Sequence, residues 1–235
     1  MEQLIFELAS PEPPTFANFL SGPNREVVAA LARVAAGEAT ETGLVLWGPP
    51  GVGKTHLLRA TAAAAEIRRP VRFCADPMSL PSDPPAPSSL VLVDAVDEAD
   101  AAAQGRLFTL YNALKAGGGA LVAAALVPPA RLPLRDDVRS RLGWGLVYEV
   151  LPLADADKPA ALATYARSRG FTLGDDVIAY LLAHGQRDMT SLMTTLAALD
   201  RHSLASKRPI TVPLLREWLQ RELGFAGPGG PDRAR

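Results

Sequence analysis

The sequence predicts an α/β protein with a mainly parallel sheet, followed by a small all-α domain. Three observations support this fold class. Apolar runs that suit buried strands alternate with helical patterns through the first part of the chain, which indicates crossover connections between parallel strands. A glycine-rich loop joins the first of these runs to a helix. After residue 153 the alternation stops, and helical patterns follow one another.

The expected strands are short and apolar, as buried parallel strands are. They cover residues 42–47, 71–75, 90–94, 120–126 and 146–150. Helices are expected over residues 25–37, 56–66 and 101–115. Asn24 suits the N-cap of the first helix, because its side chain can accept a hydrogen bond from the free N–H groups of the first turn. Residues 76–89 are rich in proline and are therefore expected to form a loop.

These patterns divide the chain into parts. Residues 1–14 are expected to be an N-terminal tail that ends in a proline-rich joint, and residues 15–151 to be the α/β core. Residues 152–223 are expected to form a helical lid, with helices at 155–169, 174–184, 189–204 and 212–223. Residues 224–235 are rich in glycine, proline and arginine, a composition typical of disorder.

The composition is that of a soluble globular protein. The chain has 235 residues, of which 48% are hydrophobic and 21% charged, enough for a sizeable core. The net charge of −1 argues against broad electrostatic capture of nucleic acid. Cys74 is the single cysteine, so no intrachain disulfide can form, and a reducing cytoplasm fits. No apolar run approaches the roughly 18–20 residues of a membrane span, and the first residues lack the features of a signal peptide.

The glycine-rich loop has the full GxxxxGKT pattern between an apolar strand and a helix, which is the context that a phosphate-binding loop requires. Its residues are Gly48, Pro49, Pro50, Gly51, Val52, Gly53, Lys54 and Thr55. In such a loop the backbone N–H groups turn toward a phosphate chain, and the N-terminus of the following helix adds a partial positive charge. Lys54 can reach the β- and γ-phosphates, and the Thr55 hydroxyl can ligate Mg²⁺. The loop therefore predicts a nucleotide site.

Asp94 closes the strand expected at residues 90–94. Because the carboxyl ends of parallel strands open onto the ligand crevice, an acid there can hold the Mg²⁺ that accompanies a nucleotide. The alternative is an aspartate that caps the next helix. The phosphate loop favours the metal role.

Other residues carry weaker signals. Arg139 and Arg141 flank Ser140, and an arginine can grip phosphate oxygens with its planar fork, although an ordinary surface arginine is the alternative. The N-terminal pattern Q-L-x-Φ-x-L suits docking into a groove of a partner, with an edge strand or an unstructured start as the alternative. That pattern comprises Gln3, Leu4, Phe6 and Leu8. The three histidines are scattered, so a metal site built on them is not expected.

Several segments together resemble the DnaA-related AAA+ family, and within it the Hda-type regulatory inactivators of DnaA. Residues 15–19 with Gly22 and Asn24 resemble the family's entrance to the AAA+ domain, beside the adenine pocket. Residues 46–58 resemble its phosphate loop and include His56. Residues 140–145 resemble its arginine-finger box, which puts Arg141 at the finger position. The match covers residues 3–223 and implies that Asn24 and His56 belong to the nucleotide site.

The resemblance implies a regulator rather than an initiator. The chain leaves room for neither the N-terminal oligomerisation domain nor the C-terminal helix-turn-helix domain of DnaA, and residues 3–8 look like the sliding-clamp-binding segment of Hda-type proteins. The implied partners are DnaA and the β sliding clamp of DNA polymerase III, with DNA met only through the loaded clamp. Arg141 would act in trans on ATP held by DnaA. A homo-oligomer and a cytoplasmic, nucleoid-associated location are also expected from this resemblance.

The chain departs from the family at positions that sense or activate a γ-phosphate. AAA+ ATPases usually place a second acid after the position of Asp94, where this chain has Ala95. Ala124 stands in a stretch where a polar sensor is usual, and Thr190 stands where the lid normally offers a sensor arginine. Arg187 is close to Thr190 but would point elsewhere on a helix. These departures imply that the chain holds ADP or ATP with Mg²⁺ and has weak or no ATPase activity of its own.

Two other functions stay open at this point. One is a DNA-binding AAA+ initiation factor or helicase loader that acts as an oligomer on single strands. The other is a self-contained NTPase with a small substrate. The net charge and the missing γ-phosphate groups argue against the first, and nothing outside the nucleotide site suggests a substrate pocket for the second.

Overall fold

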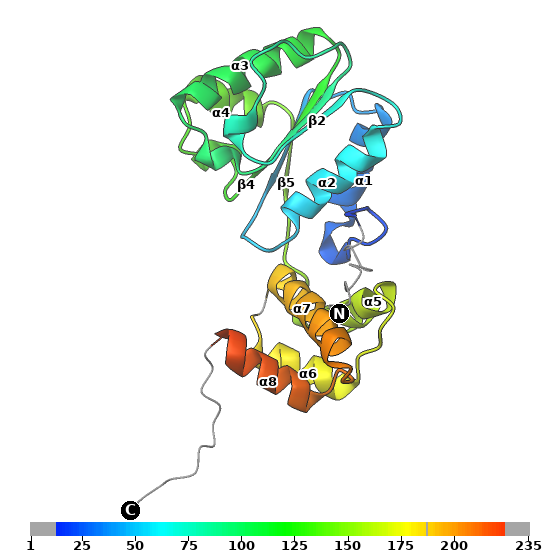
Figure 1. Cartoon of the computed structure of the whole chain (residues 1–235). Coiled ribbons are helices and arrows are strands. Elements are labelled where there is room, and N and C mark those ends of the chain that lie inside the picture. The colour runs from blue at the N-terminus through cyan, green and yellow to red at the C-terminus, as the bar shows by residue number, and fades with distance from the viewer. Residues whose placement is uncertain (1–12, 187, 224–235) are drawn as a thin grey trace, which may run out of the picture. The chain divides into compact units, whose positions relative to one another are not determined.

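The computed structural model describes residues 13–186 and 188–223, which fold into two compact units. The first unit ends at Leu153 and the second begins at Ala154 (Figure 1). The docking pattern at residues 3–8, Arg187 and the C-terminal residues 224–235 lie outside the described residues. Within the described part, none of the helices is long and apolar enough to span a membrane.

The first unit is built on a parallel sheet of five strands in the order β2-β3-β4-β1-β5. The strands are β1 (Gly43–Trp47), β2 (Val71–Cys74), β3 (Leu90–Val93), β4 (Ala120–Ala125) and β5 (Leu146–Glu149). Every neighbouring pair is parallel, and the register places Leu46 of β1 beside Ala124 of β4. The expected parallel α/β fold is therefore confirmed, and the carboxyl ends of β1, β3 and β4 meet at one edge of the sheet.

Helices cover both faces of this sheet (Figure 1). One face carries α1 (Arg25–Ala36) and α2 (Lys54–Ala65), and the other carries α3 (Ala101–Ala116) and α4 (Asp136–Gly143). Short 3-10 turns are η1 (Gly22–Asn24), η2 (Pro77–Ser79), η3 (Val96–Glu98) and η4 (Pro129–Arg131). The sequence patterns did not predict α4, because most of its residues are polar and only Val138 and Leu142 are buried along it.

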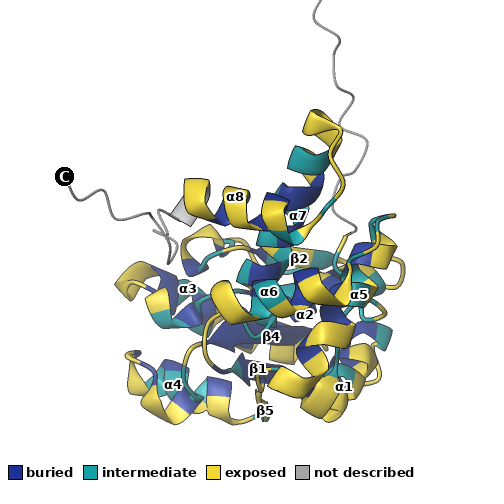
Figure 2. Ribbon diagram, turned by 90° about the horizontal axis from the view of Figure 1, so that it is seen from below, coloured by how far each residue is buried: buried dark blue, intermediate teal, exposed yellow. Residues whose placement is uncertain are grey.

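The core lies in two layers because successive side chains of a strand point to opposite faces. Leu44, Leu46, Leu90 and Leu92 join the apolar cluster under α1 and α2. Val45, Val91, Val93, Leu121 and Ala123 join the cluster under α3 and α4. Each helix correspondingly buries one side and exposes the other (Figure 2).

Asn24 occupies the N-cap position of α1 without capping it, so this expectation is wrong. Its side chain is turned to the segment that follows β5, where it accepts a hydrogen bond from Leu151 N (2.8 Å) and donates one to Leu151 O (2.9 Å). An amide side chain can satisfy both backbone groups at once, which explains how Asn24 is buried with 3% exposure.

The proline-rich loop at residues 76–89 packs against α3. Asp76 caps η2 by accepting a hydrogen bond from Ser79 N (2.9 Å). Between the loop and α3 lies a hollow of about 390 Å³, lined in part by Pro81, Pro84 and Pro85. Cys74, at the end of β2 beside this loop, is 1% exposed, and burial raises the pKa of its thiol.

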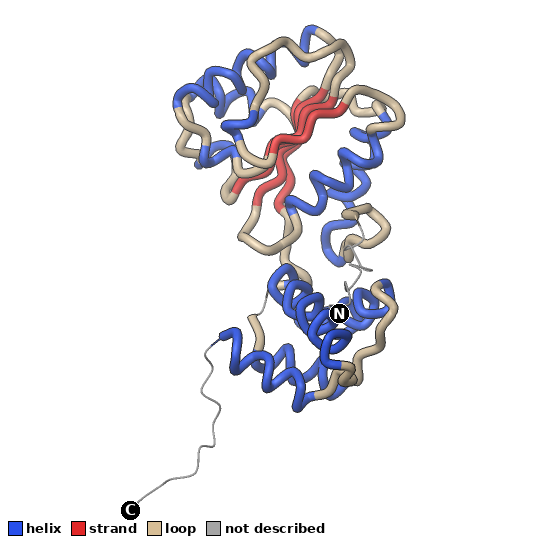
Figure 3. Tube along the Cα trace, viewed as in Figure 1, coloured by secondary structure: helices blue, strands red, loops and turns tan. Residues whose placement is uncertain are grey.

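The second unit consists of helices and loops in its described residues (Figure 3). Its helices are α5 (Lys158–Ser168), α6 (Asp175–His184), α7 (Met189–Ser206) and α8 (Val212–Leu223), preceded by the 3-10 turn η5 (Asp155–Asp157). Leucines from α5 to α8 form its core, including Leu162, Leu181 and Leu196. Arg169 and Asp200 form a buried ion pair (3.7 Å) between the end of α5 and α7. The all-α character expected of this part is confirmed.

Candidate nucleotide site and arginine surface

The glycine-rich loop connects β1 to α2 at the carboxyl edge of the sheet, and α2 begins at Lys54. Gly53, the residue before the helix, has φ +97°, a conformation that side-chain-bearing residues rarely adopt. This turn lets the chain enter α2 with its first N–H groups free, which is the arrangement that binds phosphate.

Lys54 is held over the loop that precedes it. Its ammonium donates hydrogen bonds to the carbonyl oxygens of Gly48 (2.7 Å) and Pro49 (2.9 Å). Burial lowers its pKa, and the negative charges of Asp94 and Asp97 partly oppose this shift. The Lys54 ammonium is therefore bonded to the loop and lies near two carboxylates at the same edge of the sheet.

Thr55 and Asp94 are in direct contact. Thr55 Oγ1 donates a hydrogen bond to Asp94 Oδ2 (2.5 Å), while Asp94 Oδ1 accepts one from Ala95 N (3.0 Å). A hydroxyl and a carboxylate at this distance, at the start of the loop helix, are oxygen donors of the kind that Mg²⁺ prefers. The chemistry of this donor set fits a magnesium nucleotide. Thr55 and Asp94 would bind the metal, and the loop would bind the phosphates.

The entrance segment at residues 15–19 packs against the start of α2. His56 Nε2 donates a hydrogen bond to the carbonyl oxygen of Thr15 (3.0 Å), and the Phe19 ring lies 5.5 Å from the His56 ring. Burial lowers the pKa of His56, although the bond to the carbonyl opposes this. His56 thus fastens the segment to the loop helix, and Asn24 fastens the end of β5. Contact of either with a nucleotide stays a prediction.

The structure places the three positions at which γ-phosphate groups were expected to be missing, and it corrects one of them. Ala124 lies inside β4 and faces the cluster under α1 and α2, so it cannot reach the site. The residue that β4 presents at its carboxyl edge is Leu126, which is 49% exposed. Ala95 follows Asp94 as expected, with φ +50° in the left-handed region. Thr190 is exposed in the first turn of α7.

Asp97 lies closer to the site than its sequence position suggests. The left-handed turn at Ala95 reverses the chain, so that Asp97 Oδ1 accepts a hydrogen bond from Leu126 N (3.2 Å) at the end of β4. Its charge raises the pKa of Lys54 against the effect of burial. Asp97 therefore lies near Lys54, and this edge of the sheet carries a second acid besides Asp94.

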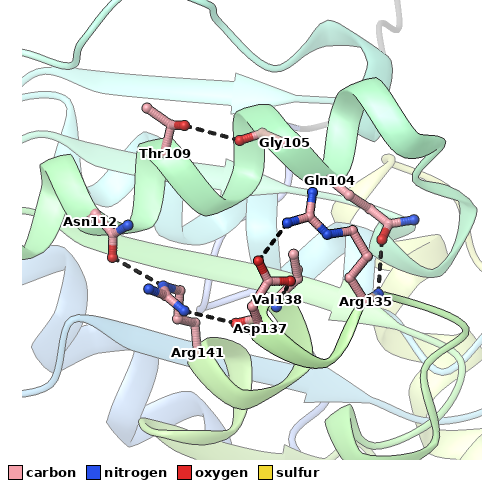
Figure 4. A network of polar contacts seen from close by, with 8 residues as sticks. All are labelled: Gln104, Gly105, Thr109, Asn112, Arg135, Asp137, Val138 and Arg141. Atoms are coloured by element: carbon pink, nitrogen blue, oxygen red, sulfur yellow. Dashed lines mark hydrogen bonds and ion pairs between the residues drawn. The ribbon is translucent and has the colours of Figure 1, made fainter.

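Arg141 lies on α4 and is turned back onto α3. Its Nε donates to Asn112 Oδ1 (3.0 Å) and its Nη1 to the carbonyl oxygen of Asp137 (3.0 Å), as Figure 4 shows. Its guanidinium carbon is 3.6 Å from the centroid of the Phe108 ring and 5.4 Å from that of Trp144. Arg139, by contrast, is paired with Asp136 on the same helix.

Gln104 of α3 fixes the start of α4. Its Oε1 accepts a hydrogen bond from Arg135 N (2.9 Å), and Arg135 in turn pairs with Asp137 (2.6 Å) (Figure 4). Val138 and Leu142 are buried in the cluster shared with α3. The helix that carries Arg141 is therefore anchored by a buried amide, an ion pair and two apolar side chains.

The surface around Arg141 also contains an exposed tryptophan. Trp144 at the end of α4 is 56% exposed, with the Lys115 ammonium 5.1 Å from its ring centroid and the Tyr111 ring edge-on at 6.4 Å. We call Phe108, Asn112, Lys115, Arg141 and Trp144 the arginine surface. Sequence reasoning singled out only Arg141 among them, although Phe108 and Asn112 are four positions apart and thus share one face of a helix.

A parallel sheet in this order, a GKT loop after β1, an acid after β3 and a helical unit after β5 define an AAA+ nucleotide-binding protein. Two family models match the chain: the bacterial DnaA ATPase domain over residues 12–72, and the Hda lid domain over residues 155–219. The chain belongs to the AAA+ proteins related to Hda and DnaA.

Solved structures share the fold at low sequence identity. Domain III of the Thermotoga maritima replication initiation protein DnaA has 21% identity and a TM-score of 0.75, over 93% of this chain and 100% of that one. AMPPCP-bound DnaA from Aquifex aeolicus has 22% identity and a TM-score of 0.65, over 83% and 67%. The Thermotoga maritima RuvB branch migration motor has 16% identity and a TM-score of 0.69, over 89% and 72%.

Proposed function

We propose that this protein regulates replication initiation by stimulating the hydrolysis of ATP held by DnaA, with Arg141 as the arginine finger that acts in trans. The observation that carries the proposal is the contrast between two places. The nucleotide loop has Lys54 and Thr55, which would hold phosphates, but Ala95 and Leu126 follow β3 and β4 at positions where groups that act on a γ-phosphate are usual. Arg141 lies on an outer surface between α3 and α4 with aromatic and cationic neighbours.

The chain's own nucleotide would have a structural role. The loop N–H groups and Lys54 would bind its phosphates, and Thr55 and Asp94 would hold Mg²⁺, which supplies positive charge between the phosphates. The similar DnaA structure carries AMPPCP, an adenine nucleotide analogue, which supports an adenine nucleotide here. We propose ADP as the resident nucleotide, with ATP turned over slowly or not at all.

Arg141 would act by electrostatics. A guanidinium cannot lose its proton at neutral pH, and its planar fork matches phosphate oxygens. Placed against the γ-phosphate of a neighbouring subunit, it stabilises the charge that develops in phosphoryl transfer, an effect worth roughly 10³–10⁵ in rate in other systems. The partner's site would supply the attacking water and the metal, and this chain would supply one fixed charge.

The test of the finger is a pair of arginine variants. Arg141→Ala is expected to lower DnaA-bound ATP hydrolysis in the presence of this protein by roughly 10³-fold, to the unstimulated rate. Arg139→Ala, two positions away and paired with Asp136, is the matched control and is expected to keep stimulation. Normal stimulation by Arg141→Ala would refute the proposal.

Docking on the sliding clamp rests on the pattern Gln3, Leu4, Phe6 and Leu8. A short segment with one directed amide and apolar anchors suits a groove on a partner. We propose that this segment binds the β clamp and confines the activity to clamp-loaded DNA. A pull-down with the clamp should lose the protein when Leu4 and Phe6 are both replaced by alanine, and equal recovery of both forms would contradict the docking role.

A second function follows from another neighbour, a DnaA structure bound to AMPPCP and single-stranded DNA (20% identity, TM-score 0.66). By that analogy the chain could act as an oligomeric initiation factor on single strands. Salt-dependent DNA binding by the isolated protein would favour this function over the regulator.

A further inference from the structure

The Arg141 guanidinium is contacted by its own chain on three sides. Asn112 accepts from Nε (3.0 Å) and the Asp137 carbonyl accepts from Nη1 (3.0 Å). The Phe108 ring covers one face of the group at 3.6 Å, which is stacking distance for a guanidinium on an aromatic ring. Two hydrogen bonds in the plane and one ring against the face fix both the position and the orientation of the group.

These contacts leave a defined part of the guanidinium available. An arginine side chain has five N–H donors. The contacts within the described residues use the Nε–H and one N–H of Nη1. One N–H of Nη1 and both of Nη2 take no part in these contacts, and the edge that Nη1 and Nη2 share is one that can meet two oxygens of one phosphate at once.

We infer that Phe108 and Asn112 are positioning residues that hold Arg141 in its acting orientation before any partner arrives. The inference rests on the proposed function, because it requires the Nη1–Nη2 edge of Arg141 to bind the phosphate oxygens of a nucleoside triphosphate in a partner's P-loop site. A free arginine side chain loses much rotational freedom when it is ordered in a complex. A side chain that is already ordered loses little further freedom, so more of its interaction energy stabilises the transition state.

Phe108 and Asn112 can be replaced without disturbing the centre of the core. Asn112 is exposed, and Phe108 is partly buried at the margin of the cluster under α3 and α4. Conservative replacements therefore keep the fold: Phe108→Leu removes the ring and Asn112→Ala removes the acceptor. Phe108→Tyr keeps a ring. Thr109→Ala, on the neighbouring position of α3 and bonded only to Gly105 of its own helix, is the control.

NMR relaxation of arginine side chains in the full-length protein measures directly how ordered Arg141 is. In ¹⁵N-arginine-labelled protein, the Arg141 Nε signal, assigned by its absence in Arg141→Lys, should be as ordered as the backbone. Phe108→Leu and Asn112→Ala should make it as mobile as an exposed arginine, and Thr109→Ala should not. A mobile Arg141 in the wild type would overturn the inference.

Stimulated hydrolysis of DnaA-bound ATP measures the consequence. Phe108→Leu and Asn112→Ala should each lower the maximal rate by about 3- to 10-fold, the cost of ordering one long side chain. The concentration for half-maximal stimulation should stay unchanged, and Phe108→Tyr should retain the wild-type rate. An effect confined to the half-maximal concentration, or no effect, would refute the positioning role. Absence of stimulation by the wild type would refute the proposed function instead, and the relaxation result would still decide whether Arg141 is held.

Discussion

The nucleotide loop and the arginine surface are both polar sites of the first unit, but their cations differ in the charges around them. At the loop, Lys54 bonds to its own loop carbonyls, and the carboxylates of Asp94 and Asp97 raise its pKa against the effect of burial. At the arginine surface, Arg141 lies on an aromatic ring and bonds to a neutral amide and a carbonyl. No acid neutralises Arg141 in the contacts of the described residues.

This difference indicates a division of labour. A site whose ammonium and carboxylate balance each other can accept a magnesium nucleotide with little net change of charge, which suits long-term holding. A cation that is oriented but not neutralised keeps its field for an incoming anion, because only an opposite charge would cancel it. Under the proposed function, the loop would retain a ligand, and the arginine surface would act on one that another molecule brings.

The sharpest way to separate the two regions is to remove the charge of the loop. Lys54→Met should weaken nucleotide binding by about 10- to 100-fold, since charge-assisted hydrogen bonds to phosphate are lost. Calorimetric titration with ADP and Mg²⁺ measures this. The Arg141 Nε signal should not change in the same variant; a loss of order there would show that the two regions are coupled.

The two hydrogen bonds between Asn24 and Leu151 should affect the stability of the protein more than nucleotide binding. Asn24→Ala leaves the N–H and C=O of Leu151 without their partner, so the free energy of unfolding should fall by about 2 kcal/mol. Asn24→Asp keeps the acceptor but places a buried carboxylate beside the Leu151 carbonyl, so it should not restore the stability of the wild type. Chemical denaturation measures the three proteins, and equal stability of Asn24→Ala and wild type would mean that water replaces the bridge without cost.

Asp97 tests whether the loop site is truly balanced. Its charge opposes that of an incoming phosphate, so Asp97→Asn should bind nucleotide about 2- to 5-fold more tightly in the absence of Mg²⁺, with the larger gain for ATP than for ADP. The asparagine keeps an acceptor for Leu126 N. Glu98→Gln on the same turn is the control. Weaker binding that appears only with Mg²⁺ would instead make Asp97 part of the metal site.

The smallest expected effect concerns pH. Burial lowers the pKa of His56 below its ordinary value of 6.5, so the unfolded chain takes up its proton at a higher pH than the folded chain does. The free energy of unfolding should therefore decrease as pH falls below 6.5, and His56→Gln should flatten this part of the profile. An unchanged profile in that variant would assign the dependence to other groups.

The fold was predictable because its signals are local and strong. Each strand of the sheet is an apolar run, and the phosphate loop has a pattern that only a few conformations satisfy. The helix α4 was missed, since its two buried residues Val138 and Leu142 give too short a period to stand out among polar neighbours. Its packing comes from Gln104, thirty-one positions from Arg135 in sequence, and no local pattern contains that information.

The candidate site was predictable in its parts but not in its geometry. Lys54, Thr55 and Asp94 could be named from spacing, whereas the approach of Asp97 depends on a left-handed alanine at position 95. Alanine rarely adopts that conformation, so no local sequence pattern indicates this approach. The role of Asn24 was mistaken for a similar reason: capping is the common use of an asparagine before a helix, and the competing partner at Leu151 is distant in sequence.

Cys74 has a practical consequence for spectroscopy. The chain contains one cysteine, it is 1% exposed, and burial raises the pKa of its thiol, so it should react slowly with labelling reagents while the protein is folded. A cysteine introduced at Lys115, on the exposed side of α3, would then be the single accessible thiol. A fluorophore attached there would report in real time the binding of a partner near Trp144 and Arg141. Cys74 in the core would not have to be replaced.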